Sequence, residues 1–254
     1  MEAYLGGEEI PAERLGAAVA LAMVEETVIP ILFTSAKNEV GVTELMDAIA
    51  KYFPSPEQAK LLPCLSSEGE DAEEIEVVCD PSKPFVGQAF KIATDPFIGK
   101  LAWIRVLQGT VTPESTYHLG DDKKAAKVGH LFKILGKDTT EAKQAVAGGI
   151  IALAKVEEIE YGALLHADAA PMFRSTPPVP TPMFSMAVTP KSRGDEQKIS
   201  GVLAKLSEED PTFGVKRDAQ TNEMVISGMG DLHLRVELSK MKTRFDLDVD
   251  TKPP

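Results

Sequence analysis

Cysteine is scarce in this chain, and its scarcity excludes two kinds of site. Cys64 and Cys79 are the only cysteines among 254 residues, no C-x-x-C spacing occurs, and the four histidines are scattered. A disulfide framework or a zinc site needs closely spaced clusters of such residues. We therefore interpret both cysteines as structural or idle thiols and predict no metal site.

Long apolar runs are also missing. No stretch approaches the roughly 20 apolar residues that a membrane span needs, and the acidic start Met1–Tyr4 lacks the basic flank of a signal peptide. The composition, with 43% hydrophobic and 26% charged residues, is that of a globular protein. We expect a cytoplasmic protein that does not contact a membrane. Its 254 residues allow one large domain or about two to three small domains.

Basic residues are outnumbered, because 27 Lys and Arg face 39 Asp and Glu and leave a net charge of −12. Bulk electrostatics therefore disfavours nonspecific binding to nucleic acid. The charges are unevenly distributed, with an acidic cluster free of basic residues at 68–76 and a group of lysines further along the chain, at Lys123, Lys124, Lys127, Lys133 and Lys137. The simplest interpretation of either run is a solvated face.

The motifs of a nucleotide-hydrolysing site are absent as well. The phosphate-binding pattern G-x-x-x-x-G-K-[ST] does not occur. The nearest stretch, Thr94–Leu101, lacks the first glycine and has leucine where the magnesium-binding hydroxyl belongs. The elements Asn-Lys-x-Asp, which reads guanine, and Asp-x-x-Gly, which senses the γ-phosphate, are also missing. We expect this chain to hydrolyse no GTP, to bind no guanine nucleotide with useful affinity and to hold no cofactor.

Two linkers divide the chain by composition. Residues 61–83 contain the acidic cluster and are too polar to pack, which predicts an exposed connector. Residues 173–182 contain four prolines, which favour an extended, semi-rigid spacer. Between the linkers, at 84–172, runs of β-branched and aromatic residues separated by glycines predict a small β-barrel. Its expected strands are Phe85–Ala93, Leu101–Leu107, Ser115–Leu119, Ala125–Leu135 and Ile150–Val156.

The pattern changes after the second linker, at residues 183–252. Apolar residues there recur alternately at strand spacing and at helical spacing, in the order β-α-β-β-α-β of a ferredoxin-like fold. The expected elements are a strand at Met183–Val188, a helix with Ile199, Val202, Leu203 and Leu206 on one face, a hairpin of Phe213–Arg217 and Glu223–Ser227, a helix with Leu234, Leu238, Met241 and Phe245 on one face, and a strand at Leu247–Thr251.

The first 60 residues contain one strand-turn-helix pattern. The apolar run Val28–Phe33 predicts a buried strand, and the polar turn Thr34–Asn38 follows it. A helix is expected after Gly41, with Thr43 as its cap and one apolar face made of Val42, Leu45, Met46, Ile49 and Phe53.

The most specific motif is Gly228–Leu234, GMGDLHL, a glycine turn that opens the second predicted helix. Together with Glu209–Phe213 and Glu223–Ser227 before it, this ordered series resembles the third domain of translation elongation factor G. Phe97–Lys100, which runs into Trp103–Gly109, resembles the second domain of the same family, and Val188–Ser192 resembles the entry to the third.

The resemblance implies a multidomain α+β chain: the C-terminal part of a GTPase α/β domain at 1–60, a translation-factor β-barrel and a ferredoxin-like third domain. We interpret the chain as an internal fragment. The whole factor of this family binds the ribosome and couples GTP hydrolysis, with magnesium, to movement of transfer and messenger RNA. The partners implied are ribosomal RNA and proteins together with the missing GTPase and C-terminal domains of the same factor, and the chain is expected to be monomeric.

The resemblance also assigns roles to three groups of residues. One group is a guanine-side remnant, the second contacts the ribosome, and the third relays the nucleotide state between domains. In that order they are Ser35, Ala36 and Lys37; Lys123, Lys124, Lys127 and Lys133; and Gly228, Met229, Gly230 and His233.

Helical spacing places His233 with Glu237, Lys240 and Arg244, away from the apolar stripe, and predicts a solvated or interface-facing histidine without a catalytic role. Gly228 and Gly230 are interpreted as providing backbone freedom at a tight turn.

Two alternatives stay open. A tetracycline-resistance ribosomal protection protein shares the same domain order. An enzyme of acylphosphatase type also has a β-α-β-β-α-β domain, but it needs an Arg and an Asn that converge on phosphate, and Arg193 and Asn222 do not lie in a phosphate-cradling loop.

Overall fold

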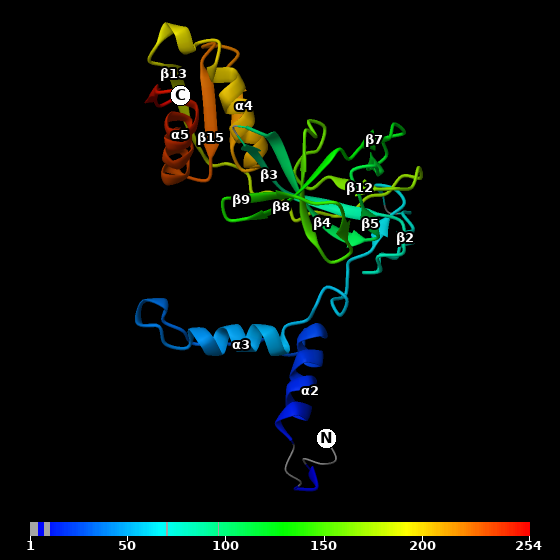
Figure 1. Ribbon diagram of the computed structural model, residues 1–254. Coiled ribbons are helices and arrows are strands. Elements are labelled where there is room, and N and C mark those ends of the chain that lie inside the picture. The colour runs from blue at the N-terminus through cyan, green and yellow to red at the C-terminus, as the bar shows by residue number, and fades with distance from the viewer. Residues whose placement is uncertain (1–4, 8–10, 70, 96) are drawn as a thin grey trace.

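The computed structural model describes residues 5–7, 11–69, 71–95 and 97–254 of the chain. It has three parts in chain order: an N-terminal arm of helices, a curled antiparallel sheet, and a C-terminal unit of four strands and two helices (Figure 1). The chain therefore has the mixed α+β character that its sequence predicts. None of the helices in the described ranges is long and apolar enough to cross a membrane.

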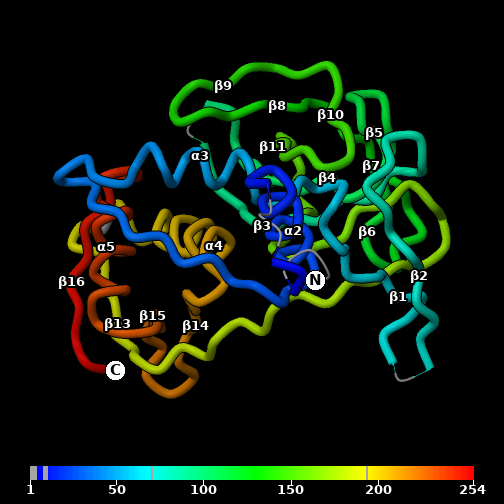
Figure 2. The backbone as a smooth tube through the Cα atoms, turned by 90° about the horizontal axis from the view of Figure 1, so that it is seen from below, coloured from blue at the N-terminus to red at the C-terminus, as the bar shows by residue number. Residues whose placement is uncertain are grey.

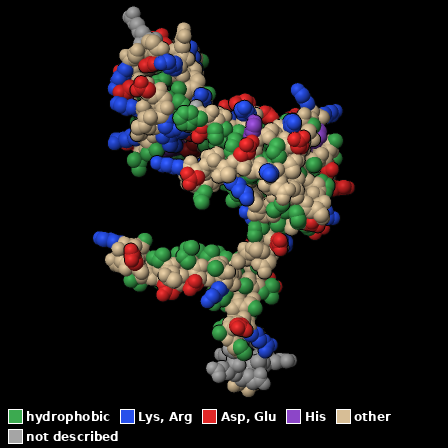
Figure 3. Space-filling model, in the orientation of Figure 1, with side chains coloured by type: hydrophobic (Ala, Val, Ile, Leu, Met, Phe, Trp, Pro, Cys, Tyr) green, Lys and Arg blue, Asp and Glu red, His purple; other side chains and the backbone are tan. Residues whose placement is uncertain are grey.

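The N-terminal arm contains α2 (Ala12–Val24), the short 3-10 helix η1 (Ala36–Asn38) and α3 (Val42–Tyr52). Gly41 precedes α3 in the left-handed region with φ 74°, and no side chain of the described residues caps the helix. The predicted cap at Thr43 is therefore wrong, because Thr43 lies inside the helix and Gly41 makes the turn into it. The predicted helix itself is confirmed, but its apolar face is largely exposed, and only Leu45 of the five predicted face residues is half-buried (Figure 3).

The predicted buried strand at Val28–Phe33 is wrong. These residues have no regular secondary structure, and Ile29, Ile31 and Phe33 are 83%, 78% and 90% exposed. A strand is held by hydrogen bonds to a partner strand, and within the described residues none lies beside this segment. Its β-branched residues provide the propensity for a strand, but the chain as described provides no sheet for it to join.

The curled sheet has eight strands in the order β7-β6-β12-β3-β4-β11-β8-β9. Their bounds are β3 Val86–Asp95, β4 Gly99–Gln108, β6 Thr116–Leu119, β7 Ala126–Lys127, β8 His130–Leu135, β9 Asp138–Glu141, β11 Ile150–Ala154 and β12 Leu164–His166. A separate pair joins β5 (Thr110–Val111) to β10 (Ala145–Val146). The long hairpin of β3 and β4 forms the middle of the sheet, and its apolar side chains share one core with those of β11 and β12.

The single strand predicted at Ala125–Leu135 is divided in two. Gly129 interrupts it with φ 76°, so that β7 pairs with β6 while β8 pairs with β11 and β9. The short strands β5 and β10 escaped prediction, as did two strands of the curled sheet, β9 and β12. All four residues of β9 are polar and exposed, and β12 is only three residues long, so neither produces a visible apolar pattern.

Part of the predicted linker at 61–83 packs against the curled sheet, which corrects the expectation of an exposed connector. Its strands β1 (Cys64–Leu65) and β2 (Glu74–Ile75) pair with each other. The side chains of Cys64 and Val77 are buried in a small cluster with residues of the curled sheet and of the chain that follows it. The described acidic residues between the strands are exposed. Apolar residues at both ends of the acidic run outweigh its polarity and hold it as a hairpin.

Limited proteolysis should cut this hairpin first, between β1 and β2, because Glu68, Asp71 and Glu73 between the strands are exposed and charged. The expected products are an N-terminal piece and a larger piece that keeps the curled sheet joined to the C-terminal unit. Mass spectrometry of early products locates the cut. A first cut within β8 would contradict the packing of the sheet.

The C-terminal unit has four strands in the order β14-β15-β13-β16, all antiparallel. In chain order its elements are β13 (Phe184–Pro190), the 3-10 turn η2 (Arg193–Asp195), α4 (Ile199–Glu209), β14 (Gly214–Arg217), β15 (Met224–Gly228), α5 (Asp231–Phe245) and β16 (Val249–Lys252). The predicted β-α-β-β-α-β order is the one observed. Val188 and Ile226 of the sheet share a core with Leu203 of α4 and Leu234 of α5.

The C-terminal unit lies beside the curled sheet, with α4 against β3 (Figures 1 and 2). Residues 175–181, which contain three of the four linker prolines and join the two parts, are exposed and without regular secondary structure. The contact between α4 and β3 is the structural basis of the candidate site.

Candidate functional site at the end of helix α4

Three consecutive carboxylates at the end of helix α4 contact three different elements. Glu208 and Glu209 contact the curled sheet on separate strands, and Asp210 contacts the start of α5. The helix ends here because Pro211 disfavours helical geometry for the residue before it, and Asp210 accordingly has an extended backbone (φ −128°, ψ 105°).

Asp210 is held by two neighbours. Its Oδ1 accepts hydrogen bonds from the amide (2.8 Å) and the hydroxyl (2.6 Å) of Thr212, and its Oδ2 lies 3.1 Å from Nε2 of His233. Burial alone would raise the pKa of Asp210, but the hydrogen bonds from Thr212 and the contact with His233 outweigh that effect, so the pKa lies below its ordinary value. The carboxylate is therefore charged and acceptor-only at neutral pH.

His233 connects the glycine turn to the end of α4. The backbone N–H of Met229 donates to Nδ1 of the ring at 3.1 Å, so Nδ1 carries no proton. The proton of the neutral ring must then lie on Nε2, which donates to Asp210. The tautomer makes this contact a hydrogen bond between a neutral ring and a carboxylate, not an ion pair. The ring of His233 therefore links the glycine turn to the end of α4 through one hydrogen bond at each nitrogen.

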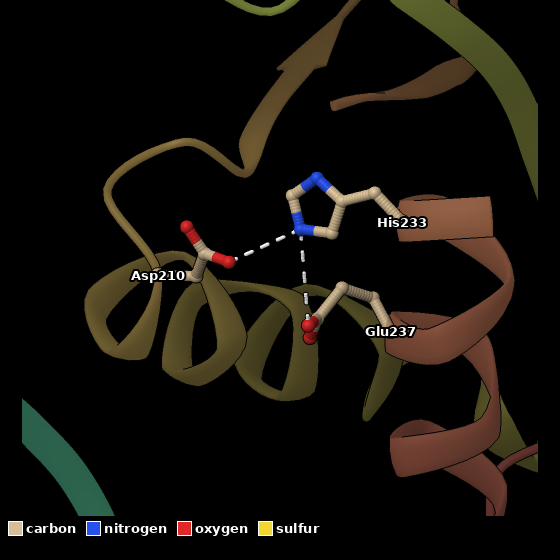
Figure 4. Close-up of side chains that lie close together, drawn as sticks. All are labelled: Asp210, His233 and Glu237. Carbon is tan, nitrogen blue, oxygen red and sulfur yellow. Dashed lines mark hydrogen bonds and ion pairs between the residues drawn. The ribbon is translucent and has the colours of Figure 1, made fainter. Parts of the chain in front are cut away.

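Of the two surroundings predicted for His233, solvent or an interface, the structure shows a contact with the end of α4, because its side chain is 17% exposed and its Nε2 lies 3.1 Å from Oδ2 of Asp210. Glu237, one helical turn later, is 1% exposed. The polar face of α5 is turned toward the end of α4, so it forms an internal contact between the helices (Figure 4). Helical spacing alone predicted which residues share the polar face of α5, but not that this face contacts the end of α4.

The side chains of Asp210, His233 and Glu237 converge, and each offers an atom of a kind that binds divalent cations (Figure 4). The local hydrogen bonds disfavour a cation there. Nε2 of His233 would have to lose its proton while Nδ1 accepts from Met229, which would leave the ring without a proton. Lys240 also lies 2.5 Å from Oε1 of Glu237, so an ammonium group already occupies that side of the carboxylate.

The two glycines of the turn have different roles. A Cβ on Gly228 would lie 2.7 Å from Cδ2 of Leu234 and 2.9 Å from Nδ1 of His233, so this position has room only for glycine. Gly230 has φ 176° and ψ 176°, an extended backbone that any residue adopts, and a Cβ there would have no neighbour within 4 Å among the described residues. The interpretation of both as sites of backbone freedom is wrong, because Gly228 is required for close packing and neither backbone angle nor space requires glycine at position 230.

The other two groups of predicted site residues lie elsewhere. Ser35, Ala36 and Lys37 form the tight turn at η1 in the N-terminal arm, where Ser35 and Val40 exchange backbone hydrogen bonds. Among the predicted ribosome-contact lysines, Lys123, Lys124 and Lys127 belong to the β6–β7 hairpin. Lys133 lies on β8, near the other end of the strand order. All four lysines are exposed.

A cleft of about 670 Å³ separates the curled sheet from the C-terminal unit beside α4. Lys100 and Tyr161 line it on one side, and Glu208 and Met224 on the other. Lys100 and Glu208 pair with each other at 3.1 Å, so these two charges of the cleft join the two parts.

Comparisons with known proteins assign both parts to one family. Residues 84–167 match the family model described as Elongation factor G domain 2, and residues 179–253 match that of Elongation Factor G, domain III. A crystal structure of a protein from Thermus thermophilus is similar to the whole chain, with a TM-score of 0.76 and 27% sequence identity. The chain spans 35% of the length of that protein. The chain therefore belongs to the elongation factor G-like translation factors.

Proposed function

We propose that this chain is the part of a ribosome-binding elongation factor G-like GTPase that contacts the ribosome and relays the state of the nucleotide. The observation that carries the proposal is the succession of domain 2 and domain III matches in one chain. The parent protein would couple GTP hydrolysis to ribosomal translocation in the cytoplasm. GTP and magnesium would be held by the parent's GTPase domain, whose end we assign to residues 1–60, with Ser35, Ala36 and Lys37 on the guanine side.

The proposed relay starts at the glycine turn. Met229 positions the ring of His233, His233 binds Asp210, and the two residues before Asp210 bind the curled sheet. A displacement of the turn would therefore be transmitted through α4 to the curled sheet. Gly228 supports this path by admitting Leu234 and His233 close to β15.

The lysines of the curled sheet are the proposed ribosome contacts. If Lys123, Lys124, Lys127 and Lys133 neutralise phosphates of ribosomal RNA, each contributes about 0.7–0.9 to the slope of log affinity against log salt. The net charge of −12 opposes this contact, so we expect weak and strongly salt-sensitive binding.

Changing Lys124 and Lys127 together to glutamate should weaken ribosome binding and flatten its salt dependence. Sedimentation of the chain with ribosomes over a salt series measures both quantities. The matched control is the double change of Lys51 and Lys60 to glutamate, which alters the net charge equally but lies before the curled sheet. Equal binding and an equal salt slope for the Lys124 and Lys127 variant and the parent would refute the assignment of these lysines.

A further inference from the structure

The hydrogen bonds and ion pairs between the curled sheet and the C-terminal unit are concentrated in one small region of the interface. Across the described residues, every hydrogen bond or ion pair between these two parts ends on Glu208, Glu209 or Arg244 of the C-terminal unit. The segment 175–181 that also connects them is exposed and has no regular structure. The covalent connection therefore limits the distance between the two parts, but it does not fix their relative orientation.

Glu209 is the central residue of these polar contacts. Arg244 of α5 donates to both of its carboxylate oxygens, with Nη1 2.6 Å from Oε2 and Nη2 2.8 Å from Oε1. The amide of Thr94, at the end of β3, donates to Oε1 at 2.6 Å, and the carbonyl of Thr94 accepts from Nη2 of Arg244 at 2.9 Å. One residue of the curled sheet is thus bound through both of its backbone groups by a bidentate pair of the C-terminal unit.

The electrostatics of these contacts favour the charged form of Glu209. Burial alone would raise the pKa of Glu209, but hydrogen bonds from Arg244 and from the amide of Thr94 outweigh that effect and hold the pKa below its ordinary value. The hydrogen bonds between Arg244 and Glu209 in turn raise the pKa of Arg244. The side chain of Glu209 is 10% exposed, so water competes little for its hydrogen bonds.

A second polar contact lies beside the first. The ammonium of Lys100, from β4, donates to the carbonyl of Glu157 at 2.8 Å and pairs with Glu208 at 3.1 Å. Lys100 is only 6% exposed, so its position is fixed within the curled sheet. Adjacent residues of α4 therefore bind both strands of the β3–β4 hairpin.

We infer that Glu209 and Arg244, bound to Thr94, together with Glu208 bound to Lys100, form a polar lock that sets the orientation of the C-terminal unit on the curled sheet. Each part has its own apolar core, so the C-terminal unit can move as a rigid body when the lock opens. The inference does not depend on ribosome binding.

Distance measurements between two spin labels test the lock. Thr139 on β9 and Ser239 on α5 lie outside the lock and can be changed to cysteine. The native Cys79 is changed to serine, whereas Cys64 can stay, because it is buried and burial raises the pKa of its thiol, which suppresses the reactive thiolate. The labelled parent should give one narrow distribution of distances.

Arg244→Gln should broaden that distribution and add a second population, because both bonds of the lock to Thr94 lose their geometry. Arg235→Gln is the matched control. Arg235 is on the same helix and also pairs with a carboxylate, Asp231 at 2.7 Å, but that pair lies within α5 and does not reach the curled sheet. The control should keep the narrow distribution of the parent.

Glu208→Gln provides an independent variant, because it removes only the pair with Lys100 and its side chain is 46% exposed, so the core of the C-terminal unit stays intact. It should shift or broaden the distances in the same direction as Arg244→Gln. Unchanged distributions in both lock variants, or equal broadening in the Arg235→Gln control, would overturn the inference.

Discussion

Changing Gly228 to valine should destabilise the C-terminal unit by about 1–3 kcal/mol, as expected for overpacking a filled core. The first carbon of any side chain at this position would lie 2.7 Å from Cδ2 of Leu234 and 2.9 Å from Nδ1 of His233. Leu234 is fully buried, and the ring of His233 is held at both nitrogens. Neither side chain can move without breaking other contacts, so the strain falls on the packing of α5 against β15.

Gly230→Val is the control for this prediction. The backbone of Gly230 is extended, and a Cβ there would meet no atom of the described residues within 4 Å, so the change in stability should stay within about 0.5 kcal/mol. Hydrogen exchange over residues 199–252 measures both variants, because it reports on the C-terminal unit separately from the rest of the chain. Equal protection in the two variants would show that packing at Gly228 does not limit stability.

The order of elements in the C-terminal unit was predictable because its helices bury apolar residues at helical spacing and clear turn signals separate the elements. Ile199, Leu203 and Leu206 repeat at helical spacing and are all buried, and the prolines and glycines mark the turns between elements. Local pattern and tertiary packing agree here, so the sequence predicts the order of elements in a compact unit.

The N-terminal arm shows the opposite case. The apolar run of Val28–Phe33 has the composition of a buried strand, but burial and pairing are properties of a sheet and not of a segment. Without a neighbouring strand among the described residues, the run stays irregular and exposed. A sequence pattern shows that a segment can form a strand, but it does not show whether a neighbouring strand is present to pair with it.

The sequence predicted the residues that α5 contributes to the candidate site, but not the residues that contact them. The spacing of His233, Glu237 and Arg244 places them on one face of α5, which was predicted. Their partners Asp210 and Glu209 lie at the end of another helix, and the third partner, Thr94, comes from the curled sheet. Contacts between separate elements depend on how those elements dock, which periodicity does not describe. The run of three acidic residues before Pro211 was the available signal.

Asp210→Ala should destabilise the C-terminal unit by about 2–3 kcal/mol, because it removes hydrogen bonds to a charged acceptor and leaves partly buried donors without partners. Thr212 would lose the acceptor of both its amide and its hydroxyl, and Nε2 of His233 would lose its oxygen. The ring of His233 would then keep only its hydrogen bond from the amide of Met229 and would no longer link the glycine turn to α4. Hydrogen exchange in the first turn of α5 should accelerate together with that at the end of α4.

Asp218→Ala separates this effect from the loss of an ordinary turn. Asp218 accepts from the amides of Gln220 and Thr221 and from the hydroxyl of Thr221, a pattern like that of Asp210 with Thr212, but its side-chain bonds within the described residues include no histidine. Its turn is exposed, so its removal should loosen only the β14–β15 connection. If Asp210→Ala were no more destabilising than Asp218→Ala, the contact with His233 would contribute nothing to the unit. Asp210→Ala can also be made in a His233→Ala background. If Asp210→Ala costs less stability there than in the parent, the difference is assigned to the contact between Asp210 and His233, because the effects of coupled residues are non-additive.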